Sequence, residues 1–258
     1  MRLLVLNDDG IGAAGIAALV EAVEPLGEVW VVAPEHEQSA ASHAISLTRP
    51  LRIRRLRERW FSVDGTPTDC AYLAIHHLMK DEPPALAVSG INHGPNLADD
   101  VVYSGTVAAA MEATLLGVPA IAFSLVARGR PLDFTHAARF ARSLVGAALS
   151  QTLPPRLLLN VNVPGFIEPR GWAVTRLGRH TYGNQVVENR DPRGRRYYWI
   201  GGTEYSHEDL PGSDCNAVLE EQLISVTPVL LDLTDLQRME ELMRWPVDGF
   251  QRQGPAKI

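Results

Sequence analysis

The first part of the chain alternates short apolar runs with helix-like segments, and this order constrains the fold more than any other feature. Leu3–Leu6 is typical of a buried parallel strand, Ile16–Val23 of a helix that ends before Pro25 and Gly27, and Val29–Ala33 of a second strand. The pattern continues with predicted helices at Asp69–Met79, Thr106–Leu116 and Phe134–Leu149, and predicted strands at Pro84–Val88, Pro119–Phe123 and Arg156–Val163. This order predicts an α/β fold with an open, mostly parallel sheet and helices on both faces.

The pattern changes after Pro164, so we divide the chain into a core of residues 1–164 and a β-rich segment of residues 165–258. The segment contains predicted strands at Gly171–Leu177, on both sides of a turn at Asp191–Gly194, and at Leu223–Thr227, and a predicted helix at Leu236–Trp245. It has too little apolar sequence for a core of its own. We therefore expect it to bury surface against another subunit, with the terminal helix exchanged between subunits.

Composition narrows the functional classes. The 258 residues carry a formal net charge of -6, which argues against nucleic-acid binding as the main function. No apolar run is long enough to cross a membrane. The start of the chain does not resemble a signal peptide, and the only cysteines are Cys70 and Cys215. We expect a cytoplasmic protein that does not bind membranes.

Two adjacent carboxylates, Asp8 and Asp9, follow the first predicted strand. Ligands of open α/β sheets bind outside the carboxyl ends of the strands. Neighbouring carboxylates repel each other unless a positive charge neutralises them, so a divalent cation is their natural partner. The alternative is that one carboxylate caps the next helix and the other is solvated. The position at a strand end favours the metal.

The same region also fits a different binding motif. Gly10-x-Gly12-x-x-Gly15 lies between a strand and a helix, and Glu35 follows the second strand as a ribose-binding acid would. A dinucleotide pyrophosphate at this helix would, however, lie beside both carboxylates, which is electrostatically unfavourable without a cation. An aspartyl-phosphate mechanism is also disfavoured, because Asn7 occupies the place of the nucleophile.

A second group of polar residues lies further along the chain. The run from Ser89 to Asn96 contains two asparagines and two glycines, and Ser104-Gly105-Thr106 opens an alanine-rich helix. Free N–H groups and hydroxyls at a helix N-terminus suit phosphate, although an ordinary serine cap would explain one hydroxyl. His93 could donate a proton, but a lone histidine is more often a hydrogen-bonded structural residue.

Together these motifs resemble the SurE family of stationary-phase survival proteins, which are metal-dependent nucleotidases. The similarity covers nearly the whole chain. It is carried by Asn7–Gly10, Val32–Pro34 with Ser39, Gly65–Cys70, Ser89–Asn96, Tyr103–Glu112, Asp191–Gly194 and Ser225–Pro228. One departure is Gln222-Leu223, which stands where the family usually has Gly-Tyr. It affects mainly the expected subunit geometry.

The resemblance implies a Rossmann-like core, an exchanged C-terminal segment, and a homodimer or homotetramer. It also implies one Mg²⁺ or Mn²⁺ per subunit, with metal ligands at Asp8, Asp9, Ser39 and Asn92. The phosphate neighbours fall on Asn96, Ser104, Gly105 and Thr106, and the catalytic residues on Asp8, Asp9 and Asn96.

The resulting hypothesis is a 5′-nucleotidase that hydrolyses nucleoside monophosphates by metal-assisted attack of water. No serine or cysteine has a clear nucleophile arrangement, and the general acid and base are not assigned. The rival hypothesis is a non-catalytic nucleotide-binding or dinucleotide-binding regulatory protein that uses Gly10, Gly12 and Gly15. Metal-dependent release of phosphate from a nucleotide separates the two.

Overall fold

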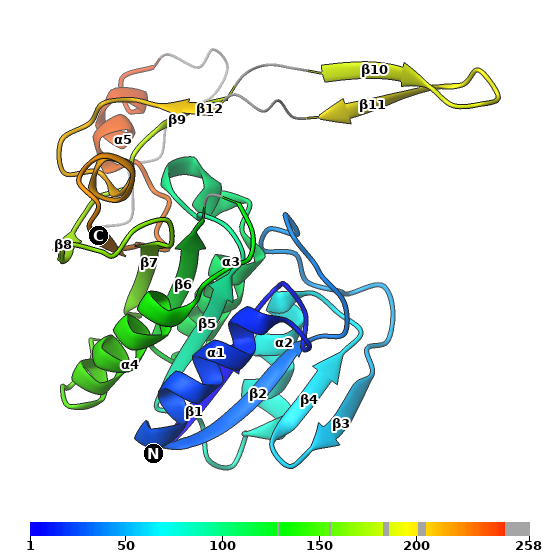
Figure 1. Ribbon diagram of the computed structural model, residues 1–258, viewed down its shortest axis with the longest axis vertical. Helices are drawn as coiled ribbons and strands as arrows, with labels where there is room; N and C mark the ends of the chain where they lie inside the picture. Colours follow the sequence, from blue (N-terminus) through cyan, green and yellow to red (C-terminus); the bar gives the residue numbers. More distant parts are fainter. Residues whose placement is uncertain (128, 155, 183–185, 201–204, 246–258) are drawn as a thin grey trace.

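The computed structural model describes residues 1–127, 129–154, 156–182, 186–200 and 205–245 (Figure 1). Its strands are β1 (Arg2–Leu6), β2 (Glu28–Pro34), β3 (Ile53–Arg57), β4 (Trp60–Val63), β5 (Leu86–Asn92), β6 (Ala120–Val126), β7 (Leu158–Pro164), β8 (Trp172–Val174), β9 (His180–Tyr182), β10 (Val186–Arg190), β11 (Arg196–Ile200), β12 (Tyr205–His207) and β13 (Ile224–Pro228). Its α-helices are α1 (Ala14–Val23), α2 (Pro67–Leu73), α3 (Gly105–Leu115), α4 (Thr135–Leu149) and α5 (Leu236–Leu242). The described residues also form short 3₁₀ or π turns: η1 (Glu24–Leu26), η2 (Ala74–Leu78), η3 (Ala98–Val102) and η4 (Asn216–Glu220).

The main sheet has the strand order β3-β4-β2-β1-β5-β6-β7-β13-β8. Strands β4, β2, β1, β5, β6 and β7 are parallel, whereas β3 and β13 run antiparallel to their inner neighbours. Because β2 and β5 lie on opposite sides of β1, the chain changes direction across the sheet beside β1. Open α/β sheets bind ligands outside the strand ends at such a point.

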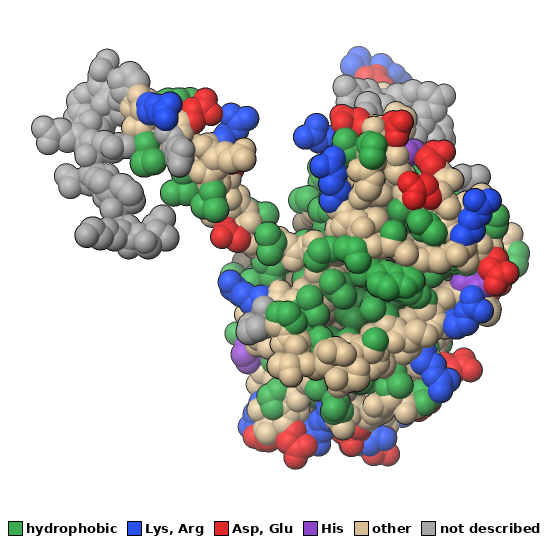
Figure 2. All heavy atoms as spheres, turned by 90° about the vertical axis from the view of Figure 1, so that its left-hand side faces the viewer, with side chains coloured by type: hydrophobic (Ala, Val, Ile, Leu, Met, Phe, Trp, Pro, Cys, Tyr) green, Lys and Arg blue, Asp and Glu red, His purple; other side chains and the backbone are tan. Residues whose placement is uncertain are grey.

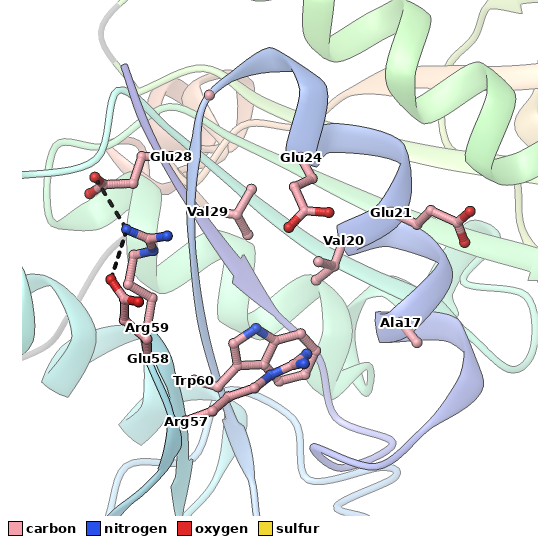
Figure 3. Close-up of a pocket in the computed structure, with 11 residues that line it drawn as sticks. Ala17, Val20, Glu21, Glu24, Glu28, Val29, Arg57, Glu58, Arg59 and Trp60 are labelled. Carbon is pink, nitrogen blue, oxygen red and sulfur yellow. Dashed lines mark ion pairs between the residues drawn. The ribbon is translucent and has the colours of Figure 1, made fainter.

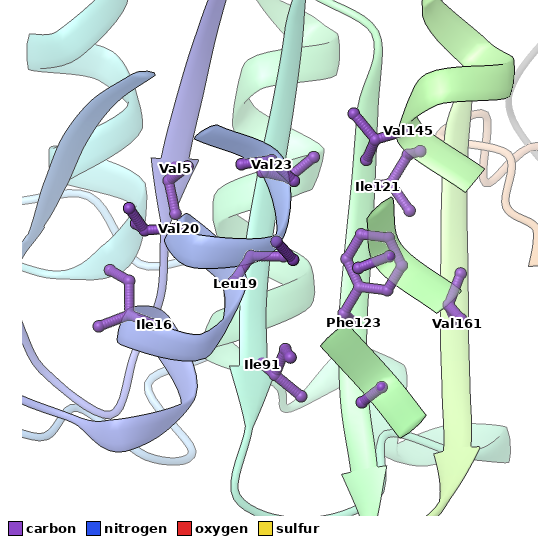
Figure 4. Close-up of a cluster of buried hydrophobic side chains, with 14 of the residues drawn as sticks. Val5, Ile16, Leu19, Val20, Val23, Ile91, Ile121, Phe123, Val145 and Val161 are labelled. Carbon is purple, nitrogen blue, oxygen red and sulfur yellow. The ribbon is translucent and has the colours of Figure 1, made fainter. Parts of the chain in front are cut away.

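Helices cover both faces of this sheet, as predicted. One core lies beneath α1 and α4, where Ile16, Leu19 and Val145 pack against Ile121 and Phe123 of β6 (Figure 4). A second core lies on the other face beneath α2 and α3. Successive residues of β1 enter the two cores alternately, as the pleat of a doubly covered strand requires. This confirms the predicted α/β fold.

Most predicted elements are present, with shifted bounds. The helix expected at Asp69–Met79 begins at Pro67, because Thr66 and Asp69 form a capping box, and it finishes in the π turn η2. The strand expected at Pro84–Val88 extends to Asn92, which places Ser89–Asn92 inside the sheet rather than in the following loop. Gly90 permits this extension, since a Cβ there would lie 2.3 Å from the carbonyl oxygen of Phe123.

Segment 165–258 attaches to the core through the sheet. β13 pairs with β7 and β8 pairs with β13, while β10 and β11 form a hairpin around the predicted turn at Asp191–Gly194. This hairpin extends away from the body (Figure 1). Every residue of both hairpin strands is exposed, including Trp199 and Ile200. Helix α5 also has exposed apolar side chains, at Leu236 and Leu242.

Apolar side chains gather on the face that carries α4 and β8 (Figure 2). Trp172 and Val174 of β8 are exposed there, and the Trp172 ring lies 6.4 Å from that of Phe140 in α4. Over the described part of the chain, no helix is long and apolar enough to cross a membrane.

Candidate active site at the carboxyl ends of β1 and β5

A cavity of about 540 Å³ opens where β1, β2 and β5 end. The loop after β1 supplies Asp9, the loop after β2 supplies Ser39, and the end of β5 supplies Asn92 and His93. Three residues of the predicted metal set, far apart in sequence, therefore line one cavity. The rest of the lining is Gly10, Gly12, Ala13, Glu35, His36, Glu37 and Arg130.

Asp8 is nearly buried and points at the start of α3. Its carboxylate accepts a hydrogen bond from the hydroxyl of Thr106, and the backbone N–H of Thr106 also stabilises it. Gly105 makes this approach possible, since a Cβ there would lie 2.7 Å from Cβ of Asp8. Burial raises the pKa of Asp8 above its ordinary value, and these hydrogen bonds only partly offset it.

Asp9 is the neighbouring carboxylate and opens toward the cavity. Its Oδ2 accepts the backbone N–H of His93 at 3.3 Å. Burial, and then the charge of Asp8, raise the pKa of Asp9 to about 7. Among the described residues, no positive side chain is recorded as lowering either pKa, and a divalent cation would supply the positive charge that compensates two carboxylates at one strand end.

The other predicted ligands add neutral oxygen atoms. Oδ1 of Asn92 lies 3.3 Å from the Thr106 hydroxyl that binds Asp8, so Asn92 and Asp8 converge. The hydroxyl of Ser39 donates to Glu37 at 2.8 Å. Among the described residues, no three His, Cys, Asp or Glu side chains form a metal site. A cation here would therefore need amide or hydroxyl oxygens beside the two carboxylates, a donor set that suits Mg²⁺ or Mn²⁺.

An unpartnered buried atom at the same edge fits such a site. The side chain of Asn7 is fully buried, and its Nδ2 donates to the carbonyl oxygen of Gly10 at 2.8 Å. Its Oδ1 has no hydrogen-bond partner in the part of the chain that the structure describes. Buried polar atoms of this kind are uncommon and often mark the place of an ion or a water.

The predicted phosphate neighbours are buried, as Asp8 is, whereas Asp9 and Asn92 are partly exposed and Ser39 is exposed. Asn96 is buried, donating from Nδ2 to Ser124 at 2.8 Å, and the hydroxyl of Ser104 caps α3 by accepting the N–H of Val107. Thr106 is fully buried against Asp8. None of these three side chains lines the cavity. Their hydrogen-bonding groups are already engaged by the protein, and their contact with a phosphate remains a prediction.

Backbone N–H groups of the Gly10–Gly15 motif form hydrogen bonds within the protein. Gly10 has a φ of 96°, which favours glycine, and the N–H of Ile11 binds the carbonyl oxygen of Pro34. The N–H of Ala13 binds Gly10, and that of Gly15 binds Nε2 of His93. These N–H groups are thus already satisfied, which argues against their use for a dinucleotide pyrophosphate.

Sequence reasoning missed two charged residues of the cavity. Arg130, in the loop after β6, is the only lysine or arginine among its described lining residues, and Glu37 follows β2. Neither lies in a recognisable motif. Their position in the sequence could have indicated them, because both follow strands of a parallel sheet, and the loops after such strands gather at one end of the sheet.

A second cavity, of about 460 Å³, lies at the amino ends of the parallel strands, beside the first residues of β2 and β4 (Figure 3). Arg57 stacks on Trp60 there, with its guanidinium 3.8 Å from the ring centre. Arg59 forms ion pairs with Glu28 and Glu58. This second cavity contains no predicted site residue, and three of its charged lining residues, Glu28, Glu58 and Arg59, pair with one another.

Comparisons with known proteins agree with this arrangement. Residues 3–184 match the family model described as "Survival protein SurE". The chain is 70% identical over 254 residues to the 5′-nucleotidase SurE of Myxococcus xanthus (strain DK1622), covering 98% of this chain and 97% of that protein. It is 57% identical over 255 residues to the 5′-nucleotidase SurE of Anaeromyxobacter dehalogenans (strain 2CP-C), covering 98% and 99%.

A solved structure gives the same result in three dimensions. The crystal structure of the SurE protein from Aquifex aeolicus superimposes with a TM-score of 0.82 at 39% identity, covering 94% of this chain and 98% of that one. The similarity thus includes both the core and most of the C-terminal segment. The chain belongs to the SurE family.

Proposed function

We propose that this protein is a 5′-nucleotidase that hydrolyses nucleoside monophosphates to nucleoside and phosphate. The relatives named 5′-nucleotidase SurE, aligned over nearly the whole chain, support this substrate class. The observation that carries the mechanism is the convergence of Asp8, Asp9 and Asn92 beside a cavity large enough for a small ligand.

We assign one Mg²⁺ or Mn²⁺ to the oxygen atoms of Asp8, Asp9, Asn92 and Ser39. When bound, the cation would supply Lewis-acid polarisation of a phosphoryl oxygen and of the attacking water. Asp8 is held by Thr106 and α3, so the end of β1 presents its carboxylates in a fixed orientation. A fixed orientation matters because each ligand then costs little reorganisation when the cation binds.

The charged side chains of the cavity affect how a negatively charged phosphate can bind there. Asp9 and Glu37 give it negative charge, and Glu35 is paired with Arg54 at 2.8 Å. A phosphate dianion entering such a cavity needs positive charge in addition to the cation. Arg130 can supply it, because it lines the cavity and has no ion pair among the described residues. We therefore assign Arg130 to the bound phosphate.

We give the predicted phosphate neighbours a supporting role in place of direct contact with the phosphate. These residues are Asn96, Ser104, Gly105 and Thr106. The start of α3 directs the backbone N–H and the hydroxyl of Thr106 toward Asp8. We infer that Gly105 and Thr106 act on the phosphoryl group mainly by orienting Asp8, and that Ser104 contributes by capping α3. Asn96 supports the loop after β5, since its backbone N–H binds Oδ1 of Asn162 at 2.8 Å.

We further propose that the C-terminal segment joins subunits into a dimer or tetramer. The hairpin β10–β11 and helix α5 expose apolar side chains that a single chain leaves uncovered, among them Trp199, Ile200 and Leu236. Exposed apolar surface of this extent usually marks an interface. A projecting hairpin and a peripheral helix are suited to exchange between symmetric copies.

The experiment that tests the catalytic proposal is phosphate release from AMP and GMP by purified protein. We expect turnover that EDTA abolishes and that Mg²⁺ or Mn²⁺ restores. A cation-independent turnover would contradict the metal assignment. Tight nucleotide binding without any turnover would instead support a non-catalytic regulatory protein.

A further inference from the structure

His93 contacts both oxygen atoms of Asp9. Its backbone N–H donates to Oδ2 at 3.3 Å, and Nδ1 of its ring lies 3.4 Å from Oδ1. None of the other described residues has recorded contacts with both oxygens of this carboxylate. Asp9 is thus oriented chiefly by the residue that follows Asn92 on β5.

The other side of the imidazole is tied to helix α1. Nε2 of His93 accepts the backbone N–H of Gly15 at 3.3 Å, so Nε2 carries no proton in this arrangement. The ring proton must then lie on Nδ1, which faces Asp9. One imidazole therefore connects the first turn of α1 to the carboxylate.

Packing holds the ring in this place. Phe134, which precedes α4, lies against it with ring centres 5.4 Å apart. Gly15 brings α1 so close to β5 that an added Cβ would lie 1.9 Å from the carbonyl oxygen of Ile91 and 3.2 Å from Nε2 of His93. The ring thus lies between the first turn of α1 and the residue that precedes α4.

We propose that His93 is a positioning residue that orients Asp9 for the divalent cation and does not itself transfer a proton to the substrate. The inference rests on the proposed metal-dependent function. Its physical basis is that a neighbouring group in contact with a ligating carboxylate holds its orientation and raises the affinity of the site; here the ring nitrogen Nδ1 lies 3.4 Å from Oδ1 of Asp9. A proton donor would instead need a free N–H directed at the leaving group, whereas Nε2 is occupied by Gly15.

The test is Mn²⁺ binding, measured by titration calorimetry on full-length protein without substrate. His93→Phe keeps an aromatic ring against Phe134 and keeps the backbone N–H that binds Oδ2 of Asp9, but it removes both ring nitrogens, so it tests the ring contact with Oδ1 alone. We expect it to weaken Mn²⁺ binding by about 10-fold to 100-fold. His77→Phe is the matched control, because His77 is exposed on η2 away from the cavity. His93→Ala provides the same comparison if the phenylalanine variant does not fold.

A second readout separates positioning from proton transfer. At saturating Mn²⁺, kcat of the His93 variant for AMP should stay within about 10-fold of wild type. A loss of about 100-fold or more at saturating Mn²⁺ would indicate general acid or base catalysis and overturn the proposal. Unchanged Mn²⁺ affinity in the variant would also overturn it. Wild-type protein that binds no Mn²⁺ would refute the proposed function itself, and the role of His93 with it.

Discussion

The hydroxyl of Thr106 donates a hydrogen bond to the carboxylate of Asp8, across 98 positions of sequence. The bond joins the first turn of α3 to the short segment that follows β1. It makes α3 part of the support of the proposed metal site. The hydroxyl is also 3.3 Å from Oδ1 of Asn92, so one side chain contacts two of the assigned ligands.

This contact predicts the effect of Thr106→Val. We expect the Mn²⁺ concentration for half-maximal activity to rise about 10-fold, because Asp8 loses the group that orients it. KM for AMP should change little. Thr114→Val is a matched control, since Thr114 is equally buried in α3 but binds the carbonyl oxygen of Ala110. A raised KM with an unchanged Mn²⁺ requirement would show that the Thr106 hydroxyl contacts the phosphate instead.

Gly12, in the loop before α1, and Gly15, in the first turn of α1, should differ sharply in their tolerance of a side chain. Gly15→Ala places a Cβ 1.9 Å from the carbonyl oxygen of Ile91, whereas Gly12 has no atom within 4 Å of the corresponding position. We expect Gly15→Ala to lower the free energy of unfolding by about 2 kcal/mol or more, from overpacking. Gly12→Ala should change it by less than about 0.5 kcal/mol. Urea unfolding measures both; equal effects would contradict the close packing of α1 on β5.

The core was largely predictable from sequence, for a physical reason. Strands such as β1 and β6 are buried on both faces and read as continuous apolar runs, and α1 ends at Val23, shortly before Pro25 and Gly27. The order of these elements is enough to indicate a parallel sheet. Asp8 and Asn92 could be assigned to one edge of the sheet because parallel strands end together.

Contacts within the site were not predictable in the same way. The Ser89–Asn92 run looks like loop sequence because it contains serine, glycine and asparagine, yet it completes β5. The bond between Thr106 and Asp8 and the link from Gly15 to His93 depend on how helices pack on the sheet. Spacing along the chain carries no signal for such contacts.

The raised pKa of Asp9 predicts how its substitution affects stability. The pKa is about 7 in the metal-free fold against an ordinary value of 3.8, so the folded state holds this proton more tightly than the unfolded chain. Folding therefore becomes less favourable as pH rises between these two values. Asp9→Asn should raise the melting temperature in EDTA at about pH 8, and by less at about pH 5.

This prediction can be checked by differential scanning fluorimetry with wild type as reference. Asp9→Asn should at the same time abolish most phosphate release from AMP, because the amide no longer neutralises the cation. A lower melting temperature at about pH 8 would mean that the Asp9 carboxylate stabilises the metal-free fold, contrary to the expected sign.

The exposed apolar side chains of the C-terminal segment predict an oligomer in solution. Light scattering at micromolar concentration should give the mass of a dimer or tetramer. Trp199→Glu combined with Leu236→Glu should shift the distribution toward smaller species, because both side chains are more than half exposed in the single chain. A wild-type protein that is strictly monomeric and fully active would contradict the assignment.

We propose that the carboxyl ends of β1 and β5 hold a divalent cation. Anomalous diffraction from crystals soaked in Mn²⁺ tests it most directly. We predict one strong anomalous peak with carboxylate oxygens of Asp8 and Asp9 and Oδ1 of Asn92 at about 2.0–2.6 Å. An active crystal form in which this position stays empty, or in which Mn²⁺ binds only elsewhere, would contradict the account.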